Sequence, residues 1–159
     1  MGDDREMSHL NEAGEVRMVD VGDKPVTDRE AVAQASVVMS AELVERFFSG
    51  DLPKGDAAAV TRVAGIMAAK KTAELIPLCH PIPLTGVDLS LERSGRGIRV
   101  VASVRTAGRT GVEMEAMTAV AVAALTIYDM VKGAERGVTI ESVELMMKSG
   151  GRSGTWKRD

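Results

Sequence analysis

Cysteine is nearly absent from this sequence. Cys79 is the only one in 159 residues, so the chain can form neither an internal disulfide nor a cysteine-rich zinc site. No spacing of His, Asp or Glu predicts a dedicated metal site either. The sequence therefore requires no cofactor.

Aromatic residues and long apolar runs are also scarce. Aromatics make up 3% of the chain, so the core must be built from Ala, Val and Met. No stretch approaches the roughly 20 apolar residues that span a bilayer, and residues 1–15 are too acidic for a secretory signal. A net charge of −3 gives no general attraction to nucleic acid or membrane. We expect a cytoplasmic protein with neither of them as a partner.

Strand and helix signals alternate along a single domain. We expect a flexible arm at 1–15, an α+β domain at 16–148 and a Gly/Ser-rich basic tail at 149–159. The predicted strands are 31–39, 87–91, 98–104 and 143–147, and the predicted helices are 41–48, 57–75 and 112–132. Ser40 and Asp56 can cap the first two helices, and Gly50 can end the first. This order predicts helices on one face of an antiparallel sheet.

The helix predicted at 112–132 is apolar nearly all round. Between Ala116 and Val131 its only polar side chains are Thr118, Thr126, Tyr128 and Asp129. Such a helix must be covered on every side. One sheet covers one side, so we expect the remaining face to contact another subunit. A second apolar stripe, Val60, Val63, Met67 and Leu75, follows the helix predicted at 57–75.

The first candidate for chemistry is His80. Pro77, Pro81 and Pro83 stiffen its loop and fix its direction, which suits a proton donor or acceptor. The alternative is an incidental His in a surface loop. Cys79 is not expected to form a dyad with it, because neighbouring side chains on an extended backbone point apart.

The long helix carries charged residues at both ends. Glu113 and Glu115 begin it and Lys132 ends it, which favourable interaction with the helix dipole would explain. Asp129 does not fit that explanation. It is three residues from Lys132, so the two can form an ion pair, either structural or acid–base. Glu115 and Asp129 lie about 21 Å apart along a helix, so either they belong to separate sites or two subunits complete one site.

Basic residues suggest an anion site. Lys54 lies in a Pro-Lys-Gly loop before a helix, and residues 148–154 form a Gly-rich basic strip whose amides could bind phosphate. The alternative for the strip is a solvated tail. Walker-type loops, dinucleotide fingerprints and a nucleophilic Ser elbow are absent from the sequence.

Together these segments resemble the cyclic pyranopterin monophosphate synthase family of MoaC type, over about residues 17–155. The matching stretches are Met18-Val19-Asp20-Val21, Lys54-Gly55-Asp56, Ala64-Gly65-Ile66, Ala68-Ala69-Lys70, Leu75-Ile76-Pro77-Leu78-Cys79-His80-Pro81, Thr110-Gly111-Val112-Glu113-Met114-Glu115-Ala116, Ala123-Ala124-Leu125-Thr126-Ile127-Tyr128-Asp129-Met130 and Lys148-Ser149-Gly150-Gly151. They occur in the family's order.

The resemblance implies a ferredoxin-like α+β subunit in a homohexamer, a trimer of dimers with active sites at dimer interfaces. The implied enzyme is a lyase of molybdenum cofactor biosynthesis, and residues 16–148 would be its catalytic domain. It would convert 3',8-cyclo-7,8-dihydroguanosine triphosphate to cyclic pyranopterin monophosphate and release diphosphate. Whether Mg²⁺ assists the triphosphate stays open.

The resemblance also implies roles for individual residues. Asp129, Lys132, Lys54 and His80 would be catalytic. The substrate contacts would be Leu78, Cys79, His80, Glu113, Met114, Glu115, Arg29 and Lys148. Proton transfers suit Asp129, His80 and Lys132, and cations would stabilise the departing diphosphate.

Two other readings were compatible with the bulk features. One is a non-catalytic oligomeric regulatory module that binds an anion or nucleotide, and the other is a purely structural oligomer. The regulatory module gives no reason for an acid at the C-terminal end of an apolar helix or for the stiff His80 loop. The structural oligomer predicts that Asp129, Lys132 and His80 can be replaced with no loss beyond stability.

Overall fold

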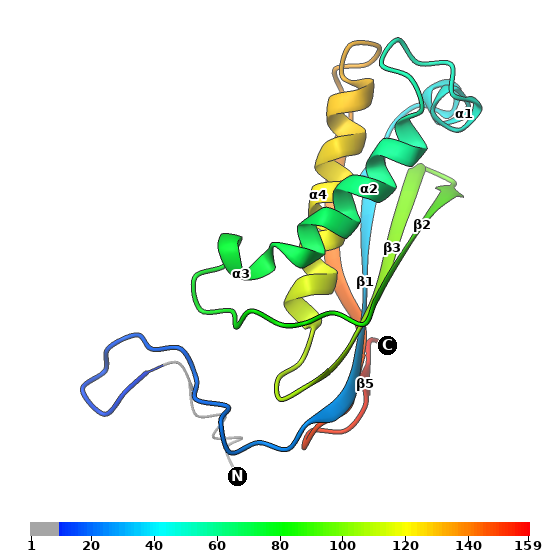
Figure 1. Ribbon diagram of the computed structural model, residues 1–159. Coiled ribbons are helices and arrows are strands. Elements are labelled where there is room, and N and C mark those ends of the chain that lie inside the picture. Colours follow the sequence, from blue (N-terminus) through cyan, green and yellow to red (C-terminus); the bar gives the residue numbers. More distant parts are fainter. Residues whose placement is uncertain (1–9) are drawn as a thin grey trace.

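The computed structural model describes residues 10–159 as one antiparallel sheet with helices packed against it (Figure 1). The strands are β1 (Thr27–Val38), β2 (Gly86–Ser94), β3 (Gly97–Gly108), β4 (Thr139–Ser149) and β5 (Trp156–Lys157), in the order β2-β3-β1-β4-β5. The helices are α1 (Ala41–Ser49), α2 (Ala57–Lys70), the single turn α3 (Thr72–Leu75) and α4 (Glu113–Val131). The predicted α+β class is confirmed.

The core lies between the sheet and α4, and small side chains make most of its contacts. Central strand β1 buries alternate residues toward the helices, three of them alanines: Ala31, Ala33, Ala35 and Val37. Helix α4 packs across β1, β3 and β4, and it buries four alanines of its own: Ala116, Ala119, Ala123 and Ala124. Small side chains on both surfaces let the helix lie close to the sheet.

The local signals at the helix ends are confirmed. The Ser40 hydroxyl accepts a hydrogen bond from the Leu43 amide at the start of α1, and the Asp56 carboxylate accepts one from Ala59 at the start of α2. Gly50 ends α1 in the left-handed conformation, with φ of 77°. These signals work because each involves residues close together in the sequence.

The prediction of a single helix at 57–75 was wrong, because the helix is interrupted at Lys71, between α2 and α3. The Thr72 hydroxyl donates to the main-chain oxygens of Ala69 (3.0 Å) and Ala68 (3.4 Å). Such bonds compete with the regular helix ladder. They turn the chain toward the Pro-rich loop that carries His80.

A second correction concerns how α4 is covered. The sheet was expected to cover one side only, but α2 covers another (Figure 1). The close approach is at Gly65, where an added Cβ would lie 3.1 Å from the Ala119 main-chain oxygen and 2.3 Å from Leu89 Cδ1. By length and composition α4 could cross a membrane, yet 56% of that stretch is buried inside the protein. It is a core helix.

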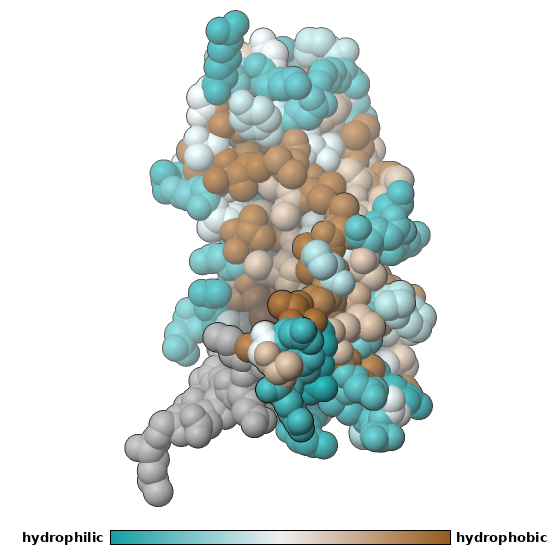
Figure 2. Space-filling view, turned by 90° about the vertical axis from the view of Figure 1, so that its left-hand side faces the viewer, coloured by the Kyte–Doolittle hydropathy of each residue, from teal (hydrophilic) through white to brown (hydrophobic). Residues whose placement is uncertain are grey.

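The apolar stripe of α2 and α3 faces outward. The residues that α2 buries are Ala57, Thr61, Gly65, Ala68 and Ala69. Its larger apolar side chains are about half exposed, and so are some on α4, as Figure 2 shows on the helical face. We call this set the apolar band: Val60, Val63, Met67, Leu75, Leu125 and Tyr128. The face of α2 that carries small side chains therefore packs in the core, and the face that carries large apolar side chains is left uncovered.

The predicted end segments are described in part. Residues 1–9 of the predicted arm lie outside the described residues, and Leu10 forms a bridge with Val16. Within the predicted tail, Ser149 still belongs to β4, and β5 pairs Trp156 with Lys148. The tail thus returns to the edge of the sheet.

The Gly65 contact predicts a stability effect. We expect Gly65→Ala to lower the free energy of unfolding by about 1 to 2 kcal/mol, because the clash with Leu89 and Ala119 outweighs the gain in helix propensity. Urea denaturation measures this difference.

Gly137→Ala is the matched control. A Cβ at Gly137 would meet no atom within 4 Å, so its stability should stay within about 0.5 kcal/mol of the starting protein. Equal stabilities of the two variants would contradict the close α2–α4 packing.

Candidate active site

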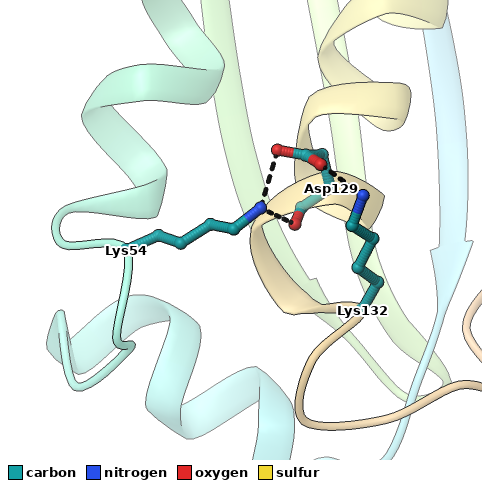
Figure 3. A network of polar contacts seen from close by, with 3 residues as sticks. All are labelled: Lys54, Asp129 and Lys132. Atoms are coloured by element: carbon teal, nitrogen blue, oxygen red, sulfur yellow. Dashed lines mark hydrogen bonds and ion pairs between the residues drawn. The ribbon is translucent and has the colours of Figure 1, made fainter.

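A cluster of two lysines and one aspartate lies at the C-terminal end of α4 (Figure 3). Lys54 Nζ donates to Asp129 Oδ2 (2.9 Å) and to the Asp129 main-chain oxygen (2.7 Å). Lys132 Nζ lies 2.8 Å from Asp129 Oδ1. The predicted ion pair of Asp129 with Lys132 is confirmed. Lys54 joins the pair from the loop before α2. Sequence analysis predicted that Lys54 binds a phosphate, whereas in the structure it contacts the Asp129 carboxylate.

The two lysines fix the charge of Asp129. Hydrogen bonds and charge attraction from Lys132, and then from Lys54, lower the pKa of Asp129 to about 2. Asp129 in turn raises the pKa of Lys132. In this arrangement the aspartate is an anion at neutral pH and Lys132 is a charged proton donor. All three side chains are about half exposed, so a ligand can reach them.

A pocket at the other end of α4 collects most of the remaining predicted residues. We call it the acidic pocket, a cavity of about 330 Å³. Its lining includes all six predicted contacts from the Pro-rich loop and the first turn of α4: Leu78, Cys79, His80, Glu113, Met114 and Glu115. The structure brings this group together.

His80 is held by a contact far away in the sequence. Its Nε2 lies 2.8 Å from the Val19 main-chain oxygen. A carbonyl oxygen can only accept, so Nε2 carries the proton and Nδ1 is unprotonated in the neutral ring. The loop itself is fixed to the sheet, because the Thr106 hydroxyl donates to the Pro83 main-chain oxygen at 2.6 Å.

Glu115 is the group in this pocket that titrates near neutral pH. It is only 3% exposed, and burial, followed by the charge of Glu113, raises its pKa to about 7. Burial and Glu115 also raise the pKa of the Cys79 thiol, which therefore stays protonated. Sequence analysis placed Glu115 among the substrate contacts and missed its acid–base capacity, because burial cannot be read from a first-turn glutamate.

A basic groove adjoins the acidic pocket, with which it shares Lys24, Thr110, Gly111 and Glu113. Its volume is about 650 Å³. Five cationic residues line it: Lys24, Arg29, Arg109, Lys148 and Arg152. Lys148 Nζ lies 3.1 Å from Glu113 Oε1, so one acid and one base join the two cavities. The groove suits an anionic ligand, and the pocket suits a group that bears N–H donors.

Arg29 and Lys148 were predicted, whereas Lys24, Arg109 and Arg152 were not. Arg152 lies in the basic strip of residues 148–154, which was considered as a phosphate site. The other two adjoin matching stretches, Lys24 after Met18-Val19-Asp20-Val21 and Arg109 before Thr110-Gly111. Their nearness to these matching stretches was the signal in the sequence that could have identified them. Their chemistry depends on a fold that unites the two segments.

The predicted separation of the two ends of α4 is confirmed by its continuity from Glu113 to Val131. Glu115 and Asp129 lie about 21 Å apart along it. One chain therefore carries two groups of candidate residues, the lysine–aspartate cluster and the acidic pocket with its groove, which would be half-sites of a site shared by two subunits. Among residues 10–159, no group of three or more His, Cys, Asp or Glu is placed to hold a metal ion.

The buried Glu115 predicts a pH-dependent stability. Its folded-state pKa of about 7 exceeds the ordinary value of 4.5, so the folded protein holds a proton that the unfolded chain has lost. Stability should then fall as pH rises between these values. Between pH 5 and pH 8 the starting protein should lose about 2 to 3 kcal/mol of unfolding free energy that Glu115→Gln does not lose. Urea denaturation of both proteins at the two pH values measures this difference.

Glu42→Gln serves as the control, because Glu42 is exposed in the first turn of α1. Its stability should follow that of the starting protein at both pH values. Parallel pH curves for all three proteins would show that Glu115 is not held protonated.

Comparison with known proteins identifies the family of the chain. The MoaC family profile matches residues 18–151. Curated proteins named cyclic pyranopterin monophosphate synthase are similar over nearly the whole chain. The Thermomicrobium roseum protein is 55% identical over 97% of this chain and 94% of its own length. The Chloroflexus aggregans protein is 53% identical with the same coverage, and the Corynebacterium efficiens protein is 52% identical over 95% and 97%.

Proposed function

The chain belongs to the MoaC family and acts as a cyclic pyranopterin monophosphate synthase, a lyase of molybdenum cofactor biosynthesis, and we propose that two subunits complete each active site. The proposed substrate is 3',8-cyclo-7,8-dihydroguanosine triphosphate, which becomes cyclic pyranopterin monophosphate and diphosphate. The observation that carries the proposal is the division of acid–base groups between the two ends of α4.

The two adjoining cavities match the two parts of such a substrate. The guanine-derived base carries N–H groups, which the carboxylates of Glu113 and Glu115 can accept in the acidic pocket. The triphosphate is anionic, and the basic groove offers cations from three separate segments of the chain. The Glu113–Lys148 pair would lie where the two parts of the substrate join.

The protonation state of each residue suggests its part in the reaction. Opening the base ring and forming the pterin requires groups that give and accept protons near neutral pH. Glu115 can serve at one end, with the unprotonated Nδ1 of His80 as an acceptor. At the other end Asp129 raises the pKa of Lys132, so Lys132 stays charged and would act as a cation and hydrogen-bond donor to the substrate. Asp129 stays ionised and holds both lysines in place.

Closure of the cyclic phosphate is a displacement at phosphorus. A substrate hydroxyl oxygen attacks the α-phosphorus, and the bond from that phosphorus to the diphosphate oxygen breaks. Negative charge then builds on the leaving diphosphate. Arg29 and Lys148 in the groove, with Lys54 from the partner-facing cluster, would stabilise it. A Mg²⁺ ion bound to the triphosphate would add its charge to theirs.

Self-association follows from the apolar band. Half-exposed large side chains gather on the helical face in Figure 2, and covering them removes apolar area from water. We assign the chain to a homohexamer, a trimer of dimers, of ferredoxin-like subunits, because the strand–helix order β-α-β-β-α-β and the family resemblance favour it. The proposed location is the cytoplasm, which a GTP-derived substrate supports.

Subunit mixing tests the shared site. Asp129→Ala and His80→Ala should each release little diphosphate from the cyclised GTP intermediate. If the two half-sites come from different subunits, a co-refolded equal mixture regains about a quarter of the starting turnover, because half the dimers are mixed and each has one intact site.

Asp129→Ala refolded with Lys132→Ala is the control mixture. Both changes lie in the same half-site, so every hybrid site lacks either Asp129 or Lys132 of the lysine–aspartate cluster, and no turnover should return. Recovery in neither mixture, with both hexamers intact, would exclude a site shared between subunits. Absence of diphosphate with the unaltered protein would overturn the activity itself.

The apolar band predicts the assembly. Val63→Glu should lower the mass measured by light scattering, because a charge buried at a subunit contact is costly. Val16→Glu changes another exposed valine, away from the band, and should keep the original mass. An unchanged mass for Val63→Glu would place the subunit contact elsewhere.

A further inference from the structure

A short irregular segment closes both cavities. Residues 19–24, which we call the strap, lie before β1 and form neither helix nor strand. Val19, Val21 and Lys24 line the acidic pocket, and Lys24 also lines the basic groove. The strap is thus a wall of the site, although it comes from the start of the domain.

Apolar packing holds the strap only weakly. Val19 and Val21 are half-buried, and the rest of the strap is exposed. Its internal bonds shape a turn, in which Gly22 N donates to Asp20 Oδ1 (2.8 Å) and Lys24 N donates to the Val21 oxygen (3.1 Å). These bonds do not connect the turn to the sheet or to α4.

Two side chains of the body donate to the strap among residues 10–159. One is His80, through Nε2 to the Val19 oxygen. The other is Arg109, through Nη1 to the Gly22 oxygen. They come from different elements and bind carbonyls three residues apart. Together they form a clasp, one half of which is an acid–base group of the site.

Arg109 is itself held in place. It lies in the turn between β3 and α4, where Arg29 Nη2 donates to its main-chain oxygen (3.3 Å) and Arg29 Nε donates to the Gly108 oxygen (3.0 Å). The turn therefore aims the Arg109 guanidinium at the strap from a fixed base. Its flat, forked shape lets one nitrogen bind the carbonyl while the others face the groove.

We propose that Arg109 is a positioning residue, which fixes the strap so that the Val19 carbonyl keeps His80 in its Nε2–H form and Lys24 stays beside the groove. The inference rests on the proposed function for its effect on turnover. Its structural part stands apart from that function, because strap order and the His80 tautomer can be measured without substrate.

The experiment compares Arg109→Ala, Arg109→Lys and Arg96→Ala in the full-length protein. Arg96 is the matched control, an arginine at the opposite end of β3 whose exposed ion pair with Glu141 is far from the strap along that strand. Hydrogen–deuterium exchange measures the amides of residues 19–24. Nitrogen chemical shifts of labelled histidine measure the His80 tautomer at pH 8.5, and the chain has only two histidines.

For Arg109→Ala we expect strap exchange to rise about tenfold, since the strap loses one of its two clasp bonds, the one from a charged donor. The His80 signal should move toward a mixture of tautomers, and diphosphate release should fall at least about tenfold. Arg109→Lys should recover part of each effect, because an ammonium can still donate to the Gly22 oxygen. Arg96→Ala should match the unaltered protein in all three.

Unchanged exchange or an unchanged tautomer in Arg109→Ala would overturn the positioning role. A freed strap with full turnover would overturn its catalytic consequence. Should Arg109→Ala not fold, Arg109→Lys decides by the same measurements. If the unaltered protein releases no diphosphate, the proposed function fails. The exchange and tautomer measurements then still test the clasp.

Discussion

The close packing of α4 between the sheet and α2 is the constraint on which the rest depends. Alanines of β1 form the contact on one side, and Gly65 forms it on the other. Such surfaces leave no room for charged side chains in the middle of the helix, where Thr118 and Thr126 are the polar residues. Its charged groups therefore lie at the two ends, about 21 Å apart. A core helix thus separates the acid–base groups into two clusters, which the proposed assembly would bring together.

The two ends show how surroundings divide one chemical group into two roles. Glu115 and Asp129 are carboxylic acids on the same helix, yet their pKa values move in opposite directions. Burial keeps Glu115 close to its titration point at neutral pH. Two lysines lower the pKa of Asp129, which is also exposed to solvent and stays ionised. The first carboxyl can exchange protons near neutral pH, whereas the second pairs with two cations.

Assembly and catalysis follow from the same packing. Because the small side of α2 faces the core, its large apolar residues are left on the surface as the apolar band. Covering that band would provide the free energy that brings half-sites together. The strap completes the walls of each half-site through polar contacts with His80 and Arg109. In the proposed assembly the site would depend on contacts both between and within subunits.

The sequence by itself determined whatever depends on near neighbours. Alternation predicted the strands, capping residues predicted the starts of α1 and α2, and a spacing of three predicted the Asp129–Lys132 pair. Only the tertiary structure decided how distant segments meet. It brought Lys54 to Asp129 across 75 positions, buried Glu115, and placed Lys24 and Arg109 on one groove. Local patterns fix backbone shape, whereas burial and long-range contacts arise when the small faces of α2, α4 and β1 pack together.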